Sequence, residues 1–435
     1  MQILSFLAFL RIVLLSLSML FFLSAEETVF KTIPFSPLPS DRPYANRNLS
    51  AEARAQAVLQ AMTLDEKLNA VGGFQLMFSP PLPRLGLRPL LFSDASQGIH
   101  LRDDIVTRLK QSTAFPCTLA LAATWDPELA VLYAQSIGEE CRAGDIAVLL
   151  GPGMNIYRSS ECGRNFEYLG EDPYLAGRLV SSYVTGLQKT GTMATLKHFL
   201  GNNSEYLRAT SDSVISERAI HEIYTPAFKA GIDAGAGAVM TSYNLVNGEW
   251  VGHSPIWVDQ LLRKELGFKG LVMSDWGAIQ ENEKFMTTAI DLCMPDLKGI
   301  YLTDLFKEKK FSEKDLDAKI LRWLTAFFKM GFYDRPQEDL SFLKKLPAHD
   351  AVALRTAQES IILLSNRNHI LPLQAQTYHK ILLVGPAAKG VWGHLPAPKP
   401  PAKKSSGLLG GGGSGGVEGN HLVSLKDALF HEFIF

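Results

Sequence analysis

The sequence predicts an α/β protein whose main domain is a TIM-like (β/α) barrel, and three observations support this class. Short apolar runs that end in polar or glycine-containing turns alternate with longer helical patterns over residues 50–335. Several of these runs end in a chemically reactive side chain. The chain of 435 residues also suits a barrel of about 250 to 300 residues followed by part of a second unit.

The first residues predict a signal peptide over 1–25. Ile3 to Leu23 is almost wholly apolar, with Arg11 inside the run, and Ser24 and Ala25 then resemble a signal-peptidase site. We therefore expect export to the periplasm or the extracellular space, with no stable membrane partner after cleavage. An uncleaved membrane anchor is the alternative, because the run is long enough to span a bilayer.

Composition excludes some partners. The chain has 43 Lys and Arg against 44 Asp and Glu, and the charges are mixed along it. The sequence therefore predicts no concentrated basic face that would bind nucleic acid. The four cysteines (Cys117, Cys141, Cys162 and Cys293) are too far apart for zinc or redox spacing. Export would allow some of them to pair, but their isolated positions favour small buried apolar residues.

Residues 26–49 are predicted as an extended lead-in, and the barrel domain as residues 50–335. The first helix is expected over Ser50 to Met62, with Ser50 as its N-cap. Five apolar runs are then expected to be buried parallel strands. They are LRPLLFSD (87–94), IAVLLGPGMNIYR (146–158), TMATLKHF (192–199), GAVMTSYN (237–244) and GLVMSDW (270–276).

The last of these strands places a carboxylate at its C-terminal end, where barrel enzymes have their catalytic residues. Leu271, Val272 and Met273 form the buried run, and Asp275 follows where the strand stops. The alternative interpretation is that Asp275 only caps a helix that begins near Ala278.

Polar side chains recur at the ends of the other strands, which predicts one common rim. Its members are Asp94, Arg158, Lys197, His198, Tyr243 and Asp275. Each alone has an ordinary explanation as a turn residue, a surface cation or a packed core residue. Together they mix acids, cations and hydroxyl donors, which suits a hydroxyl-rich ligand such as a sugar and predicts no metal site. An aldolase-type Schiff base at Lys197 is disfavoured, because this lysine has no apolar pocket of its own.

At this point the chain resembles glycoside hydrolase family 3, the exo-acting β-glucosidases, β-xylosidases and their relatives. The resemblance runs from about Ser50 to Val417. The motifs that carry it are SDASQGIH, AFPCTLALAATWDPEL, GPGMNIYRSSECGRNFEYLGEDPYLAGRLVSSYVTGLQ, KHFLGNNSEYLRATSDSVISERAIHEIY, MTSYNLVNGE and GLVMSDWGA. It implies a barrel followed by an α/β sandwich domain, an active site between them, a small oligosaccharide or glycoside as substrate, and no metal or cofactor.

The resemblance also implies roles for individual residues. Asp275 matches the catalytic nucleophile, while the residues that match the sugar-binding pocket are Asp94, Arg158, Lys197, His198, Arg208 and Tyr243. A retaining glycosidase needs an ionised carboxylate about 5 Å from a protonated acid, and Lys197 and Arg158 are expected to keep Asp275 ionised. One departure is His100, with Arg102 close by, where many members have an arginine.

The C-terminal part is expected to be an incomplete α/β sandwich. A linker is predicted over 336–352, with Leu340 to His349 at its centre, and a partial sandwich domain over 353–435. Within this part, Asp350 to Leu364 is expected to be a helix and Lys380 to Gly385 an opening strand. The glycine-rich stretch at 408–417 fits either a flexible linker or the glycine-rich loop that the family has at this place.

The acid/base residue is not identified in this chain. The family's acid/base is a glutamate of the second domain, and Glu359, Glu418 and Glu432 do not lie in a matching segment. Relatives without that domain use a histidine of a barrel loop, but the corresponding loop at 200–213 contains none. We therefore expect a truncated, retaining β-glucosidase-like hydrolase of impaired activity. The alternative is a sugar-binding fragment without turnover.

Overall fold

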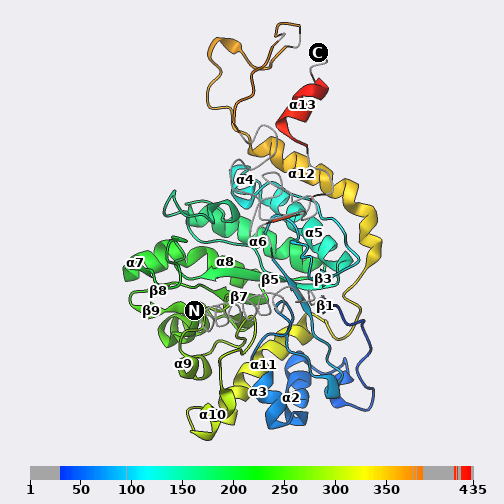
Figure 1. Ribbon diagram of the computed structural model, residues 1–435, viewed down its shortest axis with the longest axis vertical. Helices are drawn as coiled ribbons and strands as arrows, with labels where there is room; N and C mark the ends of the chain where they lie inside the picture. The colour runs from blue at the N-terminus through cyan, green and yellow to red at the C-terminus, as the bar shows by residue number, and fades with distance from the viewer. Residues whose placement is uncertain are drawn as a thin grey trace, which may run out of the picture.

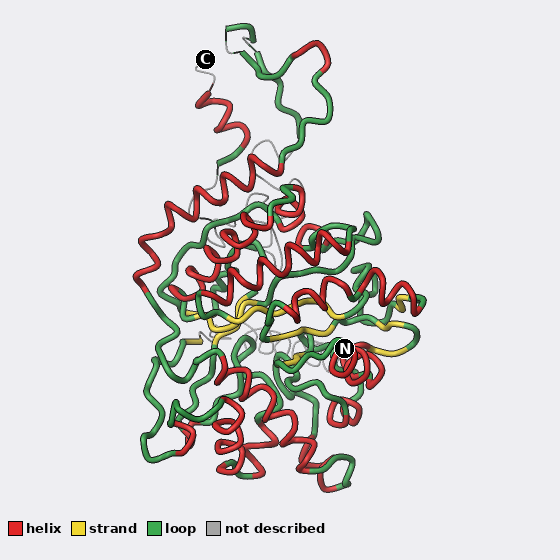
Figure 2. The backbone as a smooth tube through the Cα atoms, turned by 180° about the vertical axis from the view of Figure 1, so that it is seen from behind, coloured by secondary structure: helices red, strands yellow, loops and turns green. Residues whose placement is uncertain are grey.

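The computed structural model describes residues 30–94, 96–374, 376–378, 380–385, 416–417, 419 and 423–432. The expected signal peptide, the segment rich in proline and lysine at 396–404 and almost all of the glycine-rich stretch lie outside these residues. In the described part, short strands lie at the centre of the barrel domain with helices on both sides (Figures 1 and 2).

A five-stranded parallel sheet forms the centre of the fold, with the order β10-β7-β5-β4-β2. The strands are β2 (Leu91–Ser93), β4 (Ile146–Leu149), β5 (Met193–Phe199), β7 (Ala238–Thr241) and β10 (Leu271–Met273). Each lies inside one of the five predicted runs, and every residue in them is buried. Burial on both faces explains why the runs are continuously apolar rather than alternating.

Shorter backbone segments close this sheet into a barrel. Beyond β10, Leu292 bridges Met273 in parallel and Cys293 bridges Gly72. At the other edge, Phe78 bridges Leu91 of β2 in an antiparallel sense, and Phe74 and Phe78 bridge each other. The expected TIM-like barrel is thus confirmed. Its closure uses one antiparallel segment, because the chain turns back between residues 74 and 78.

Helices cover the sheet. The longer ones around the barrel are α2 (Ala51–Ala61), α5 (Pro127–Ala143), α6 (Pro173–Lys189), α8 (Pro226–Asp233), the π-helix η6 (Pro255–Glu265) and α11 (Glu313–Lys329). Shorter ones are α3 (Leu64–Asn69), α4 (Thr118–Ala123), α7 (Glu217–Ala219), α9 (Asn282–Thr287) and α10 (Leu302–Lys307). The expected cap of the first helix is confirmed, because the Ser50 side chain accepts a hydrogen bond from Ala53 N at 3.2 Å.

Small elements complete the barrel domain. The minor strands are β1 (Phe30–Lys31), β3 (Ile105–Val106), β6 (Asp212–Ser213), β8 (Leu245–Val246) and β9 (Glu249–Trp250). The single-turn helices are η1 (Pro43–Ala45), η2 (Pro83–Leu85), η3 (Asn165–Glu167), the π-helix η4 (Ile220–Tyr224) and η5 (Val251–His253). Most of them lie in the connections between a strand and the next helix, where the site residues are found.

The chain after the barrel differs from expectation. The predicted linker segment Leu340 to His349 is helical instead, forming η7 (Leu340–Lys345) and the start of α12 (Leu346–Ser360). Pro347 in the first turn of α12 explains the early start, since proline is favoured there. The helix packs against α4 and α5 (Figure 1). The remaining described elements are η8 (Arg367–His369) and α13 (Leu425–Glu432).

The strand expected at 380–385 does not form in the structure. Leu382 and Val384 are 87% and 81% exposed, and no described neighbour bonds to their backbone as a partner strand. A strand without a partner leaves its amide and carbonyl groups unpaired, so the segment remains irregular.

The cysteines are all free, with Cys141, Cys162 and Cys293 buried and Cys117 half-buried. This confirms their interpretation as small packed residues. None of the helices among the described residues is both long enough and apolar enough to cross a bilayer. Across the same residues, no three His, Cys, Asp or Glu side chains gather in a way that would hold a metal ion.

Candidate active site

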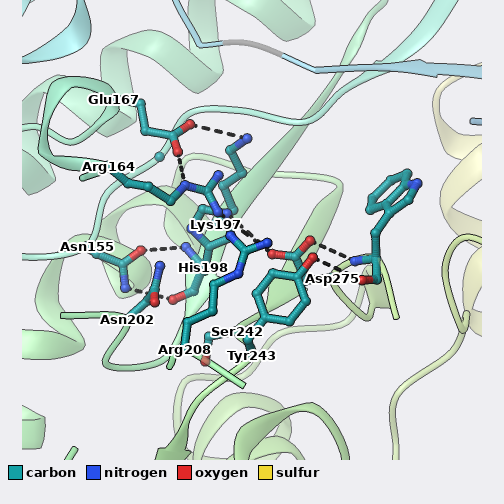
Figure 3. A network of polar contacts seen from close by, with 12 residues as sticks. Asn155, Arg164, Glu167, Lys197, His198, Asn202, Arg208, Ser242, Tyr243 and Asp275 are labelled. Atoms are coloured by element: carbon teal, nitrogen blue, oxygen red, sulfur yellow. Dashed lines mark hydrogen bonds and ion pairs between the residues drawn. The ribbon is translucent and has the colours of Figure 1, made fainter. Parts of the chain in front are cut away.

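The candidate site lies at the carboxyl ends of the barrel strands, as the rim hypothesis predicts. Lys197 and His198 are the fifth and sixth residues of β5, Tyr243 follows β7, and Asp275 follows β10. Their side chains point toward one another in Figure 3, together with Arg164, Glu167 and Arg208 from the intervening loops.

The two carboxylate oxygens of Asp275 are in different situations. Oδ1 accepts a hydrogen bond from the Trp276 backbone N–H at 2.7 Å. Oδ2 has no hydrogen-bond partner among the described residues and lies 3.7 Å from His198 Nε2 and 4.0 Å from Arg164 Nη1. The next helix, α9, begins only at Asn282, so the interpretation of Asp275 as the cap of a helix near Ala278 is wrong.

Burial and nearby cations act in opposite directions on Asp275. The side chain is 10% exposed, and burial raises the pKa of its carboxyl above the usual value. Arg164, the Trp276 N–H and Lys197 oppose this rise by stabilising the charged form. These groups therefore limit how far burial raises the pKa of the Asp275 carboxyl.

Arg164 and Glu167 belong to the site, although the sequence reasoning did not single them out. Arg164 Nε donates a short hydrogen bond to Glu167 Oε1, and Lys197 Nζ lies 3.4 Å from Glu167 Oε2. Burial alone would raise the pKa of Glu167, but Lys197 and Arg164 hold it below the usual range. Glu167 therefore holds Arg164 and Lys197 in place near Asp275. Because Lys197 is paired with a buried carboxylate, the structure does not favour the Schiff-base alternative.

Arg158 does not join this group. Its side chain is exposed, and the guanidinium that faces Asp275 belongs to Arg164, six residues later in the same loop. The expectation that Arg158 keeps Asp275 ionised is therefore corrected. The strand that precedes it ends at Leu149, and the intervening turns carry Arg158 away from the rim.

His198 is held as a neutral base. Its backbone N–H donates to Asn155 Oδ1 at 2.7 Å, its backbone carbonyl accepts from Asn155 Nδ2 at 2.8 Å, and Tyr168 Oη lies 3.4 Å from Nδ1. Burial, and then the charges of Arg164, Lys197 and Arg208, hold the pKa of His198 well below its usual value. Its Nε2 has no hydrogen-bond partner among the described residues and faces Asp275.

Tyr243 and Arg208 form the outer side of the site. The Arg208 guanidinium lies 4.1 Å from the centre of the Tyr243 ring, and its Nη1 donates to Glu205 Oε2 at 2.8 Å. The Tyr243 hydroxyl donates to the Trp276 carbonyl oxygen at 3.0 Å. Burial, and next the charge of Asp275, raise the pKa of Tyr243, so its hydroxyl keeps its proton.

Asp94 lies on a loop next to this group. The side chain is half-buried, and its backbone carbonyl accepts from His100 N at 3.1 Å. Two residues later, Ser96 Oγ accepts from Gly153 N at 3.2 Å, and Gly153 in turn bridges Lys197. Arg102, which stands close to the family's arginine position, is instead paired with Asp104 at 2.8 Å.

Comparison with known protein families gives one match that covers more than half of the chain. Residues 82–311 match the model of the glycosyl hydrolase family 3 N-terminal domain. Among curated proteins, a thermostable β-glucosidase B of Acetivibrio thermocellus is 36% identical over 326 residues, which are 73% of this chain and 43% of that protein. A β-glucosidase of Bacteroides ovatus is 33% identical over 422 residues, covering 90% and 53%.

Solved structures give the same result. β-Glucosidase 3B from Thermotoga neapolitana in complex with glucose superposes with a TM-score of 0.77 at 31% identity, covering 87% of this chain and 54% of that one. The β-glucosidase of Kluyveromyces marxianus in complex with glucose gives 0.74 at 30% identity, covering 88% and 45%. The chain thus spans about half the length of the relatives that it matches.

Proposed function

The chain belongs to glycoside hydrolase family 3, and from this membership we propose that its barrel binds the non-reducing terminal sugar of a β-linked glycoside and attacks it with Asp275. The reaction class is retaining glycoside hydrolysis of the β-glucosidase type. The relatives whose structures contain glucose support a glucose-like sugar as the first ligand to test.

One observation carries this proposal. Asp275 Oδ2 and His198 Nε2 are buried, lack hydrogen bonds to the described residues and face each other at 3.7 Å. Buried polar atoms without partners are costly, and they are typical of places where a ligand supplies the missing bonds. A sugar lying against both atoms would offer a hydroxyl to the histidine nitrogen and its anomeric carbon to the carboxylate oxygen.

The surrounding residues have distinct tasks in this proposal. Arg164 and Lys197 keep Asp275 ionised before attack and, anchored by Glu167, cannot swing toward solvent. The Tyr243 ring, with the Arg208 guanidinium stacked on it, is proposed to contact the outer side of the sugar. Asp94, on its neighbouring loop, is proposed to accept hydrogen bonds from sugar hydroxyls.

A retaining mechanism also needs a proton donor for the leaving group. Two further carboxylates belong to the described network, but Glu167 is bound to Arg164 and Lys197, and Glu205 is bound to Arg208 and Asn202. Neither is free to protonate a leaving group. We therefore propose that this chain acts poorly on natural glycosides. Sugar binding without turnover is the second candidate function.

The dependence of the rate on the leaving group tests this proposal. A general acid contributes about 10²- to 10⁴-fold when the leaving group is poor, but little when it departs as a stable anion. A dinitrophenyl β-glucoside should be cleaved, and cellobiose should be turned over far more slowly. Comparable rates on both substrates would show that a proton donor exists in the chain.

The Asp275→Asn variant is the matched control for the same assay. It should lose about 10³-fold or more of the rate on the dinitrophenyl substrate, because no covalent intermediate can form. Near-normal turnover by this variant would contradict the assignment of Asp275.

Export is a separate proposal that rests on the sequence alone. The apolar run from Ile3 to Leu23 and the small residues Ser24 and Ala25 support a cleaved signal peptide. N-terminal sequencing of the protein recovered outside the cytoplasm should begin near Glu26. Recovery of the intact run in the membrane fraction would support an anchor instead.

A further inference from the structure

We propose that His349, on the helix that follows the barrel, is a positioning residue that holds the Asp94 loop (Asp94 and residues 96–100) through Glu140 and Ser112. The proposal rests on the function proposed above, because it concerns a loop to which sugar binding has been assigned. The proposed connection lies outside the group around Asp275, and each of its links is a hydrogen bond between buried residues.

The first step joins α12 to α5. His349 is 2% exposed, and each of its ring nitrogens faces a different carboxylate. Nδ1 lies 2.8 Å from Glu140 Oε1, and Nε2 lies 2.9 Å from Glu139 Oε2. Two carboxylates on opposite sides of one imidazole need two N–H donors, so this arrangement is complete only when the ring is protonated.

The second step joins Glu140 to the backbone beside the Asp94 loop. The Ser112 hydroxyl donates to Glu140 Oε2 at 2.7 Å, and the Thr113 N–H donates to the same oxygen at 2.8 Å. Ser112 Oγ then accepts a hydrogen bond from Ile99 N at 3.2 Å. Ile99 belongs to the Asp94 loop, so a chain of three side chains connects α12 to it.

The Asp94 loop is also touched by another late segment of the chain. A Cβ built on Gly98, whose φ is +138°, would lie 3.0 Å from the Val417 methyl carbons and 2.7 Å from the Thr113 carbonyl oxygen. Val417 itself is buried. The loop is thus backed by residues after the barrel, while its Ser96 contacts Gly153 beside Lys197. A shift at the back of the loop would therefore reach the site.

The charge of His349 makes this positioning dependent on pH. Its ring is faced by Glu139 and Glu140 of α5, and Lys345 at the end of η7 also binds Glu139 at 2.7 Å. Burial would lower the pKa of His349, but the hydrogen bonds that its ring donates to Glu140 and Glu139 raise it above the usual value. The pairing is therefore fully present below the unfolded pKa and is lost as pH rises through the higher folded pKa.

Two variants and one control test the proposal in the full-length chain. His349→Gln is neutral and removes the protonated ring, and Ser112→Ala removes the hydroxyl that connects Glu140 to Ile99. Lys345→Ala is the matched control, because it removes a cation bound to Glu139 but leaves the contacts of Glu140 intact. Binding of deoxynojirimycin, a glucose-like iminosugar, is measured by calorimetry between about pH 5 and about pH 9.

We expect both test variants to bind the iminosugar roughly three- to tenfold more weakly than the unchanged protein at low pH, with the control within about twofold. The deficit of His349→Gln should shrink as pH rises, since the unchanged protein then loses the proton too. The deficit of Ser112→Ala should persist. The hydrogen-exchange rate of the Ile99 amide should increase in both test variants and not in the control.

Equal affinity and equal Ile99 exchange in the unchanged protein and Ser112→Ala would overturn the proposal, as would a His349→Gln deficit that does not vary with pH. If His349→Gln fails to fold, the Ser112→Ala variant and the pH dependence of Ile99 exchange in the unchanged protein decide the matter. Absence of iminosugar binding by the unchanged protein would instead count against the proposed function, and Ile99 exchange would still test the connection.

Discussion

Asp275 illustrates how single residues tune this site. Burial raises the pKa of its carboxyl, and Arg164 is the foremost of the groups that lower it again. As the proposed nucleophile, Asp275 would have to be ionised to attack, so the rate of any cleavage should rise with pH through the pKa of this group. The balance between burial and these groups, Arg164 first among them, therefore sets the acid side of the pH profile.

Replacing Arg164 tests that balance. In Arg164→Ala, the rate on a dinitrophenyl glycoside should begin to rise at a higher pH than in the unchanged protein, because the main stabilising cation is gone. The variant should also lose about 3 to 5 kcal/mol of stability, since a partner of the buried Glu167 is removed. Arg158→Ala is the control, and its profile and melting temperature should stay unchanged because the side chain is exposed. A shift with Arg158→Ala and none with Arg164→Ala would reverse this assignment.

The difference between these two arginines also shows what the sequence could reveal. Lys197, His198, Tyr243 and Asp275 lie within or directly after apolar runs, so the strand pattern places them in one rim. Arg164 and Glu167 lie in a loop without periodicity, well past the end of β4. The only signal for them was the motif CGRNFEY, quoted for the resemblance, in which an arginine precedes a glutamate by three residues.

At the scale of elements, one buried lysine holds the turn that leads to a barrel-closing segment. Lys319 on α11 is 1% exposed, and its Nζ donates to the carbonyl oxygens of Phe285, Thr288 and Ile290 at 2.7, 2.6 and 2.7 Å. The chain then continues to residues 291–294, whose backbone bonds to β10 just before Asp275. Lys319 thus supports the strand that carries the proposed nucleophile.

Lys319→Met should therefore destabilise the protein by at least about 2 kcal/mol, because three buried carbonyl groups lose their donor. Lys329→Met is the control on the same helix. That lysine is 58% exposed and paired with the equally exposed Glu52, so its loss should stay within about 0.5 kcal/mol. Chemical denaturation measures both, and equal losses would show that the three bonds of Lys319 contribute nothing specific.

Element prediction from the sequence succeeded where burial is continuous and failed where pairing is long-range. The five apolar runs contain all the strands of the parallel sheet. The closing segments at 71–74, 77–79 and 291–294 are bridges of one or two residues, too short to produce a periodic signal. At 380–385 the apolar signal is present, but no strand forms there. An apolar run alone does not provide a partner strand.

At the scale of the whole molecule, the described chain divides into a closed barrel and a segment after α12 in the sequence that makes few buried contacts. Ile361 to Leu364 are all at least 60% exposed, as are Leu382 and Val384. In contrast, α12 itself is tied to α5 through His349 and to the loop before α5 through Arg355 and Asp126. Local stability is low where few buried contacts hold the backbone.

Limited proteolysis should therefore cut first between Ile361 and Gly385 and leave the barrel with α12 as a resistant product. Mass spectrometry of the earliest fragments identifies the cut. First cuts inside residues 50–335 would contradict this division of stability.

The most direct test of the account is covalent labelling with a dinitrophenyl 2-deoxy-2-fluoro-β-glucoside. The fluorine slows breakdown of the glycosyl-enzyme and the activated leaving group removes the need for a proton donor, so the label accumulates on the nucleophile. We predict one label per chain on the peptide that contains Asp275, and none in Asp275→Asn. A label on Glu167, Glu205 or another carboxylate, or turnover of the activated substrate with no label at all, would contradict the central claim that Asp275 is the nucleophile.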